Sequence, residues 1–305
     1  MSTEYIHFTA AQKEAARQTD LVSLLQSQGE RLKRSGKEYV WRDGSEKVTV
    51  RGNLWFHQYE RIGGDAVDFV RRFYNMDFPQ AVNFLLGNNG GALPQAEPVK
   101  REPPKPFTLP PKNDNMRRVY AYLLNRRGID REVLSAFVHK GMIYESADYH
   151  NAVFVGYDEH GIARHAHKRG TGSESTYKGN AESCDPRYSF HWTGTDSTLY
   201  LFEAPIDMLS FISLHKENWR SHSYAAACCV GDQVLFQMLK ANPNINTVCL
   251  CMDNDAAGQA ANKRISDKLF IQGIKHEVLV PKLKDWNEDL LCDEQEETEC
   301  QTLQL

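Results

Sequence analysis

The alternation of apolar strands with amphipathic helices after residue 196 is the feature that most constrains the fold of this chain. Four short apolar runs read TLYLFE, SYAAACCVG, TVCLCMD and HEVLVP. Between them lie three segments with helical periodicity, APIDMLSFISLH, DQVLFQMLKAN and AAGQAANKRISDKLFIQG. Apolar strands linked by helices predict a parallel sheet with helices on both faces. The expected fold class of residues 196–291 is therefore α/β, with ligands expected at the carboxyl ends of the strands.

Carboxylates follow three of these strands. Glu203 ends the first strand, and Asp285 comes shortly after the last. Asp253 and Asp255 end the third strand, within LCMDNDAAG. Because no His stands in these motifs, the oxygen ligands suit Mg²⁺ or Mn²⁺ better than zinc. A lone Asp-x-Asp is also an ordinary polar strand end, so the predicted metal site depends on the three strand ends together. Asp207, in the first turn of its helix, either favours the helix macrodipole or joins the metal group.

Prolines mark the main boundary in the chain. Residues 88–114 contain seven of the twelve prolines and are expected to form an extended, semi-rigid linker. Before the linker, residues 1–87 read as helix, short strands and helix, a small α+β module. After it, residues 115–195 read as a second α+β subdomain, and residues 292–305 form an acidic tail.

Composition excludes several classes of protein. No segment approaches eighteen consecutive apolar residues, so no membrane span is expected. The N-terminus lacks the basic patch and apolar core of a secretory signal, so we expect a cytoplasmic protein. Seven cysteines, none in the first 183 residues and none in a CxxC pair, fit neither a disulfide framework nor a zinc knuckle. The net charge of −4 conceals ten basic residues against four acids between Lys100 and Lys140. Such a local basic surface can hold nucleic acid.

The order of the acidic motifs carries a family resemblance. FEAPIDMLSF, LCMDNDAAGQAA and KDWNEDL resemble the Toprim domain shared by bacterial primases, topoisomerases and some nucleases. The resemblance covers about residues 196–291. It implies that Glu203 is a general acid/base and that Asp253 and Asp255 are the main Mg²⁺ ligands for phosphoryl transfer, with Asp285 as a further acid. Asn287 stands where an acid is expected, so the third motif departs from the pattern.

The preceding subdomain is similar to the one that precedes Toprim in DnaG-type primases, where a basic strand and a "KY…N" segment line the template groove. The matching segments here are GIARHAHKRG and STYKGNAESCDPRYSFHW. Arg and Lys neutralise phosphates, and Tyr stacks on unpaired bases. Taken singly, each residue is equally compatible with a solvated surface charge. The residues that the resemblance assigns to nucleic acid are Arg164, Lys168, Arg169, Tyr177, Lys178 and Arg187.

The N-terminal module resembles the primase zinc-binding domain in outline, including GGDAVDFV. Its expected Cys and His positions are occupied by other residues, namely Trp41, Asp43, Gln58 and Arg61. One histidine, His57, does not make a tetrahedral site, so we expect a zinc-ribbon shape without zinc. The residues expected to stabilise the module instead are Trp41, Trp55, Phe56 and Tyr59.

The whole order resembles primase-like Toprim proteins of bacterial mobile elements and phages. This resemblance implies Mg²⁺-dependent synthesis of short primers from nucleoside triphosphates on single-stranded DNA, with a replicative helicase or a relaxase as protein partner. Two alternatives stay open from the residues alone. The same acids serve a metal-dependent Toprim nuclease, and the absent zinc ligands together with Asn287 fit an accessory protein that binds single-stranded DNA without catalysis.

Overall fold

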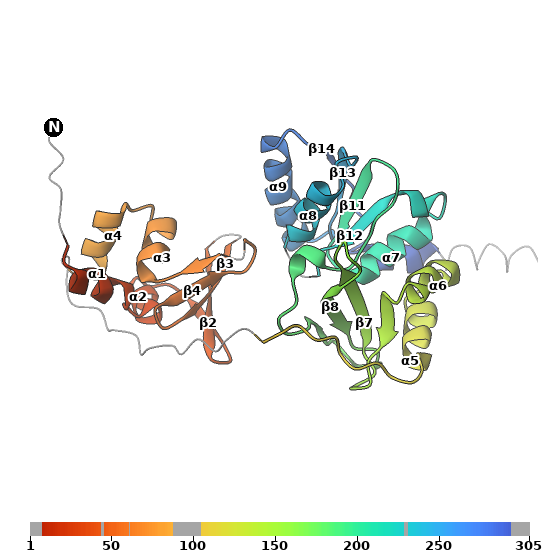
Figure 1. Ribbon diagram of the computed structural model, residues 1–305, viewed down its shortest axis with the longest axis horizontal. Helices are drawn as coiled ribbons and strands as arrows, with labels where there is room; N and C mark the ends of the chain where they lie inside the picture. The colour runs from red at the N-terminus through yellow and green to blue at the C-terminus, as the bar shows by residue number, and fades with distance from the viewer. Residues whose placement is uncertain (1–7, 44–45, 61, 88–104, 229–230, 294–305) are drawn as a thin grey trace, which may run out of the picture. The chain divides into compact units, whose positions relative to one another are not determined.

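The computed structural model describes residues 8–43, 46–60, 62–87, 105–228 and 231–293 (Figure 1). The chain divides into two compact units, Met1–Pro103 and Pro104–Leu305. Residues 88–104 of the predicted linker and residues 294–305 of the predicted tail lie outside the described residues. In the described part of the chain, no helix has the length and apolar character needed to cross a bilayer.

The first unit is an antiparallel sheet with four short helices (Figure 1). The strands pair in the order β1-β2-β3-β4-β5. Helices α2 and α3 pack against this sheet. The elements are α1 (Ala10–Arg17), α2 (Leu21–Ser27), β1 (Leu32–Ser35), β2 (Glu38–Asp43), β3 (Glu46–Arg51), β4 (Leu54–His57), β5 (Gly63–Gly64), α3 (Ala66–Phe73) and α4 (Phe78–Leu85).

An aromatic core holds the first unit together. The ring of Trp41 lies 5.2 Å from those of Phe69 and Phe73, and Trp55 lies 5.3 Å from Phe73. The prediction that Trp41 and Trp55 stabilise the module agrees with these contacts. Tyr59 is also buried, whereas the side chain of Phe56 is 36% exposed. Successive side chains of a strand point to opposite faces, so Phe56 lies on the face opposite Trp55.

The second unit begins with a small antiparallel sheet, in the order β6-β7-β8-β9. Its two helical segments are interrupted at Arg127 and Gly128, as the sequence predicts. The last turns of the first segment form a π-helix, which the sequence does not predict. The elements are α5 (Arg117–Tyr120), the π-helix η1 (Ala121–Arg126), α6 (Arg131–His139), β6 (Ile143–Glu145), β7 (Ala152–Tyr157), β8 (Ala163–Arg169), β9 (Lys178–Asn180) and the 3-10 turn η2 (Pro186–Tyr188).

The described end of the predicted linker, residues 105–114, is extended but packs against this small sheet. Phe107 and Leu109 pack beside buried Tyr144, whose hydroxyl donates a hydrogen bond of 2.6 Å to the carbonyl of Pro110. Apolar side chains within the proline-rich segment therefore anchor it to the second unit, because they gain burial there.

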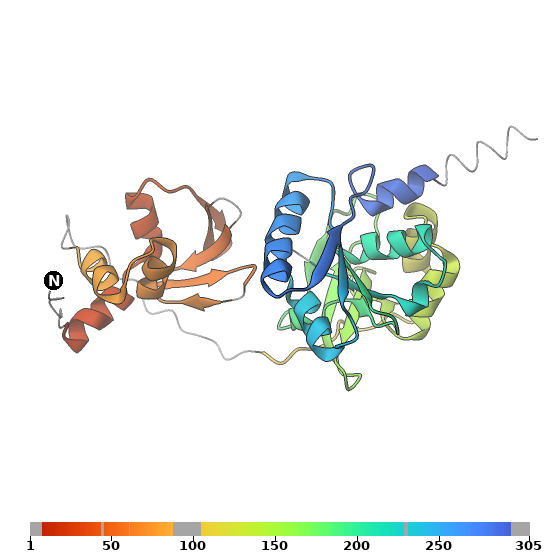
Figure 2. The same ribbon diagram turned by 90° about the horizontal axis from the view of Figure 1, so that it is seen from above.

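The larger sheet of the second unit has the order β10-β12-β11-β13-β14. Strands β11 to β14 run parallel, and the short β10 pairs antiparallel with β12. Helix α7 covers one face, and α8 and α9 cover the other (Figures 1 and 2). The predicted α/β class is confirmed. The elements are β10 (His191–Trp192), β11 (Thr198–Phe202), α7 (Pro205–Leu214), the 3-10 turn η3 (Trp219–Ser221), β12 (Ser223–Ala226), α8 (Gln233–Ala241), β13 (Thr247–Cys251), α9 (Ala256–Ile271) and β14 (Lys275–Val278).

Candidate metal and nucleic-acid site

Two adjacent parallel strands deliver acids to one edge of the larger sheet. Phe202 at the end of β11 pairs in register with Cys251 at the end of β13. Glu203 directly follows β11, and Asp253 follows β13 after one intervening residue. Because the strands are parallel and in register, both carboxylates lie at their carboxyl ends.

The start of helix α9 fixes the second aspartate of the pair. Asp255 is the N-cap of α9, and its Oδ1 accepts hydrogen bonds of 2.9 and 2.8 Å from the amides of Ala257 and Gly258. A Cβ atom on Gly258 would lie 2.0 Å from the carbonyl oxygen of Asp253. Only glycine permits this close approach, so the small residues after the acids bring the first turn of α9 against the Asp253 backbone.

The segment after β14 is tied to this turn by the residue between the two aspartates. The amide of Asn254 donates to the carbonyl of Lys284 at 2.8 Å, and its side chain donates to the carbonyl of Leu283 at 3.2 Å. Trp286 Nε1 donates to the carbonyl of Cys251 at 2.9 Å. These bonds hold Asp285 at the same edge as Asp253.

Burial and mutual repulsion act on the carboxylates that meet at this edge. Burial, followed by the charges of Glu203 and Asp285, raises the pKa of Asp253 to about 7. Burial also raises the pKa of Glu203, with Asp255 and Asp285 adding to the effect. Asp207 is 6% exposed, and burial together with Asp253, Asp285 and Glu203 raises its pKa well above the ordinary value. All five predicted acids therefore lie near this edge of the sheet and influence one another's ionisation.

The donor chemistry of this edge fits a divalent cation such as Mg²⁺ or Mn²⁺. Asp253 Oδ1 is buried and has no hydrogen-bond partner among the described residues. An orphaned, buried carboxylate oxygen surrounded by other carboxylates is a position that a hard cation satisfies. Among the residues that the structure describes, no three Asp, Glu, His or Cys side chains converge closely enough to hold a metal ion as they stand. Charge repulsion acts over longer distances than metal coordination. The carboxylates can therefore raise one another's pKa values without being close enough to share a metal ion.

A cationic side chain of the small sheet lies near the acids. The charge of Lys178 lowers the pKa of both Glu203 and Asp253. Asn180 Nδ2 donates to the carbonyl of Cys228 at 3.0 Å, which ties β9 to the segment that follows β12. Arg169 pairs in register with Lys178, so it is next to this lysine on the small sheet.

An arginine that the sequence does not single out as functional extends this basic group. Arg127 Nε and Arg169 Nε both donate to the hydroxyl of Tyr122, at 3.0 and 3.3 Å. Neither guanidinium forms an ion pair with a carboxylate among the described residues. Two uncompensated guanidinium groups at one oxygen make a position suited to a phosphate. The only sequence feature that draws attention to Arg127 is its place at the predicted helix break, Arg127-Gly128.

We call Arg127, Arg169 and Lys178 the basic group.

Asn287 is buried and has a role that only an amide can fill. It accepts a hydrogen bond of 2.9 Å from Arg127 Nη1. It also donates bonds of 2.7 Å to the carbonyl of Arg127 and 3.0 Å to Ser210 Oγ. An ionised aspartate has no donor. Asparagine at this position therefore joins the segment that carries Asp285 to α7 and to Arg127.

The other predicted nucleic-acid residues do not join the basic group. Arg164 forms an ion pair of 2.7 Å with Asp158, and Arg187 forms one of 2.6 Å with Asp185. Lys168 is followed in the strand by Arg169, so it points to the opposite face, where its Nζ lies 5.7 Å from the centre of the ring of Tyr177. These four predicted residues, Arg164, Lys168, Tyr177 and Arg187, stay predictions as nucleic-acid contacts.

The outer face of the first unit is also basic. Phe56 lies on the face of the sheet opposite the buried face. On neighbouring strands it pairs in register with Thr49, which in turn pairs with Val40. Around this row lie four cationic side chains that form no ion pair with a described residue. They are Lys33, Arg42, Lys47 and Arg51. We call these four residues and Phe56 the outer sheet face.

Two family models match parts of the second unit. Residues 200–290 match the family described as Toprim-like, and residues 121–196 match a family described as a protein of unknown function, DUF3991. The chain therefore contains a Toprim-like domain, as its acidic motifs predict. Uncharacterized protein pXO2-78 of Bacillus anthracis is 25% identical over 274 residues, which are 85% of this chain and 79% of that protein.

Solved primase structures are similar at low identity. The Aquifex aeolicus primase (zinc-binding and RNA polymerase domains) is 16% identical, with a TM-score of 0.39, over 96% of this chain and 84% of that chain. The primase fragment of the bacteriophage T7 primase-helicase is 20% identical, with a TM-score of 0.46, over 67% and 84%.

The raised pKa of Asp253 predicts how stability depends on pH and metal. The folded-state pKa of about 7 lies above the ordinary value of 3.8, so ionising this carboxyl opposes folding. The metal-free protein should lose stability as pH rises from about 4 through 7. Asp253→Asn should therefore raise the melting temperature at pH 8 and leave it nearly unchanged at pH 4, as measured by calorimetry in a chelator.

Saturating Mg²⁺ should raise the melting temperature of the wild type at pH 8 more than that of Asp253→Asn, because a cation that binds the folded state stabilises it. The matched control is Asp267→Asn, an exposed position on α9. If Asp253→Asn behaves like this control in both experiments, the acidic edge is not a metal site.

Proposed function

We propose that the protein is a DNA-directed nucleotidyltransferase of the primase kind, which synthesises short primers on single-stranded DNA from nucleoside triphosphates. The observation that supports the proposal is the position of Lys178, one member of the basic group, near the acids at the sheet edge. Lys178 is close enough to Glu203 and Asp253 to lower both pKa values. Carboxylates for a cation beside cations for phosphates are the parts that phosphoryl transfer requires.

The acids have distinct roles in this proposal. A divalent cation held by Asp253 and Asp255 would neutralise charge on the triphosphate. Glu203 receives the proton of the primer 3′-hydroxyl, and its raised pKa suits a general base that works near neutral pH. Asp255 is held by its capping bonds to α9, so its second oxygen has a fixed direction.

The basic group binds the phosphates of the nucleotide. Arg127 and Arg169 present planar guanidinium groups, which suit two-point contacts with phosphate oxygens. Tyr122 holds both of them through its hydroxyl, and Asn287 holds Arg127 from the acidic segment. The cationic and acidic parts of the site are therefore connected by hydrogen bonds, which limits their movement relative to each other.

The outer sheet face of the first unit binds the single-stranded template. Phe56 offers an exposed aromatic ring for stacking on a base, and the cationic side chains around it suit the phosphate backbone. This binding surface does not require zinc, which agrees with the expected loss of zinc ligands from the module. A helicase or relaxase partner and a role in mobile-element or phage replication remain parts of the proposal without a structural observation of their own.

Loss of the acids should abolish primer synthesis. Asp253→Asn and Glu203→Gln should each reduce Mg²⁺-dependent synthesis of oligoribonucleotides on single-stranded DNA by about a hundredfold or more. The measurement is incorporation of labelled nucleotides, with Asp267→Asn as the exposed control.

The same assay separates the alternatives when the DNA strand is labelled instead. Shortening of the strand without triphosphates, lost in Asp253→Asn, would replace the proposal with a Toprim nuclease. DNA binding that is unaffected by chelator, without any product, would identify a non-catalytic accessory protein.

Loss of the basic group should weaken nucleotide binding. Arg169→Gln and Arg127→Gln should each raise the KM for nucleoside triphosphates by about tenfold or more and change kcat less, because each removes a charge-assisted hydrogen bond. Steady-state kinetics measure both constants. Arg164→Gln is the control, because Asp158 already neutralises that side chain. Equal effects of Arg164→Gln and Arg169→Gln would contradict the assigned phosphate position.

Loss of the outer sheet face should weaken template binding by the whole chain. The triple substitution Phe56→Ala, Arg42→Ala and Arg51→Ala should reduce affinity for single-stranded DNA by about tenfold or more and lower its salt dependence. Fluorescence anisotropy at several salt concentrations measures both. Arg71→Ala, exposed on α3, is the control. Unchanged affinity and salt slope in the triple variant would exclude this face as a DNA-binding surface.

A further inference from the structure

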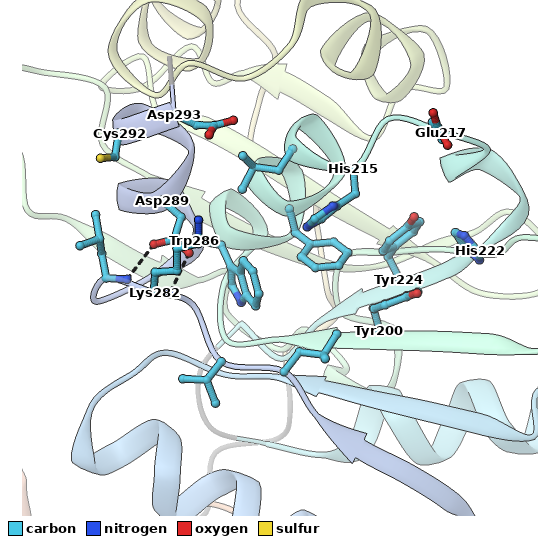
Figure 3. Close-up of a pocket in the computed structure, with 15 residues that line it drawn as sticks. Tyr200, His215, Glu217, His222, Tyr224, Lys282, Trp286, Asp289, Cys292 and Asp293 are labelled. Carbon is cyan, nitrogen blue, oxygen red and sulfur yellow. Dashed lines mark hydrogen bonds between the residues drawn. The ribbon is translucent and has the colours of Figure 1, made fainter. Parts of the chain in front are cut away.

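A cavity of about 720 Å³ lies on the α7 face of the larger sheet, between α7 and the helical segment 286–293 (Figure 3). Its size is within the range of sites for small organic ligands. None of the five acids of the candidate metal site and none of the basic group lines it. The cavity is therefore a separate feature, and the proposed nucleotide chemistry leaves it unexplained.

Aromatic rings form the floor of this cavity. Tyr200 stacks on Tyr224 with ring centres 5.4 Å apart, and Phe211 lies 5.2 Å from Tyr200. Trp286 continues the floor, with its ring perpendicular to that of Phe211 at 4.9 Å. Because each ring contacts the next, the floor is continuous. The π faces of such rings attract cations, and the rings also accept apolar chains.

The charges around the cavity are mostly negative and lie at opposite ends. Figure 3 shows Glu217 at one end and Asp293 at the other, with Trp286 and Tyr224 between them. Asp289 joins the Asp293 end, and Lys282 is the one Lys or Arg side chain among the lining residues. His215 adds little positive charge at neutral pH, because burial lowers its pKa. This arrangement disfavours phosphates and other anions.

The hydroxyl of one lining residue can contact a ligand. Tyr224 lines the cavity, and 1% of its surface is exposed. A phenol at a cavity wall offers an apolar ring face and a polar oxygen to the same ligand. Its oxygen can accept a hydrogen bond from a ligand N–H group at the floor, between the two acidic ends.

We propose that this cavity binds a linear organic polyamine. Its terminal ammonium groups would pair with Glu217 at one end and with Asp289 and Asp293 at the other. Its methylene chain would lie on the floor of Tyr200, Phe211 and Trp286, and an inner amine would donate to the Tyr224 hydroxyl. Separated carboxylates with an aromatic floor suit several charges on an apolar chain, whereas a compact metal ion uses neither the floor nor both ends.

Calorimetric titration of the full chain with spermidine tests this proposal. The titration is done in saturating Mg²⁺, so that the acids at the strand ends do not compete. Spermidine should bind at one site per chain, at least tenfold more tightly than hexylamine, which has a similar chain but one charge. Binding of both amines with equal affinity would contradict a site with two acidic ends.

Substitutions locate the binding site. Glu217→Gln together with Asp293→Asn should weaken spermidine binding about tenfold or more, and Tyr224→Phe, which keeps the ring, should weaken it several-fold. The control pair Asp148→Asn and Asp267→Asn removes the same charge at exposed positions elsewhere. Equal weakening by the control pair would mean nonspecific attraction to an acidic protein and would overturn the proposal. Unchanged affinity in both the double variant and Tyr224→Phe would also overturn it.

Discussion

Repulsion among partly buried carboxylates at one edge of a parallel sheet is the interaction on which the proposed function depends. Glu203, Asp207 and Asp253 are held together although burial and their neighbours raise the pKa of each. Folding alone gains nothing from this arrangement, because ionising such groups opposes it. Acids that are kept together at this cost indicate a site for a cation, and Asp253 Oδ1 is a buried oxygen without a partner.

Hydrogen bonds of neighbouring residues keep the acids in place, together with the capping bonds of Asp255. Asn254 and Trp286 tie the DND turn to the segment that carries Asp285. Gly258 allows the first turn of α9 to approach Asp253. Asn287 then continues the connection to Arg127 in the preceding subdomain. Arg127 and Asn287 are 160 residues apart in the sequence, so this connection forms only in the folded chain.

The sequence predicted the parts of this site that depend on local pattern. Apolar strands alternating with helices predict the sheet, and parallel strands bring Glu203 and Asp253 to one edge without further information. The role of Arg127 could not be predicted in this way, because it depends on Tyr122 and Asn287, which meet it only in the folded chain. Asn287 looked like a departure from an acidic motif, and its three hydrogen bonds explain the amide. Phe56 lies on the outer face because side chains alternate along a strand and Trp55 occupies the buried face.

Manganese soaked into crystals of the protein gives the most direct test of the central claim, because Mn²⁺ replaces Mg²⁺ at oxygen sites and is located by its anomalous scattering. The account predicts an anomalous peak about 2.0–2.3 Å from a carboxylate oxygen of Asp253, with Asp255 or Glu203 as a second ligand. This peak should disappear in Asp253→Asn. An anomalous map without a peak at these residues, at a Mn²⁺ concentration that supports any activity of the protein, would contradict the assignment of this edge as a metal site.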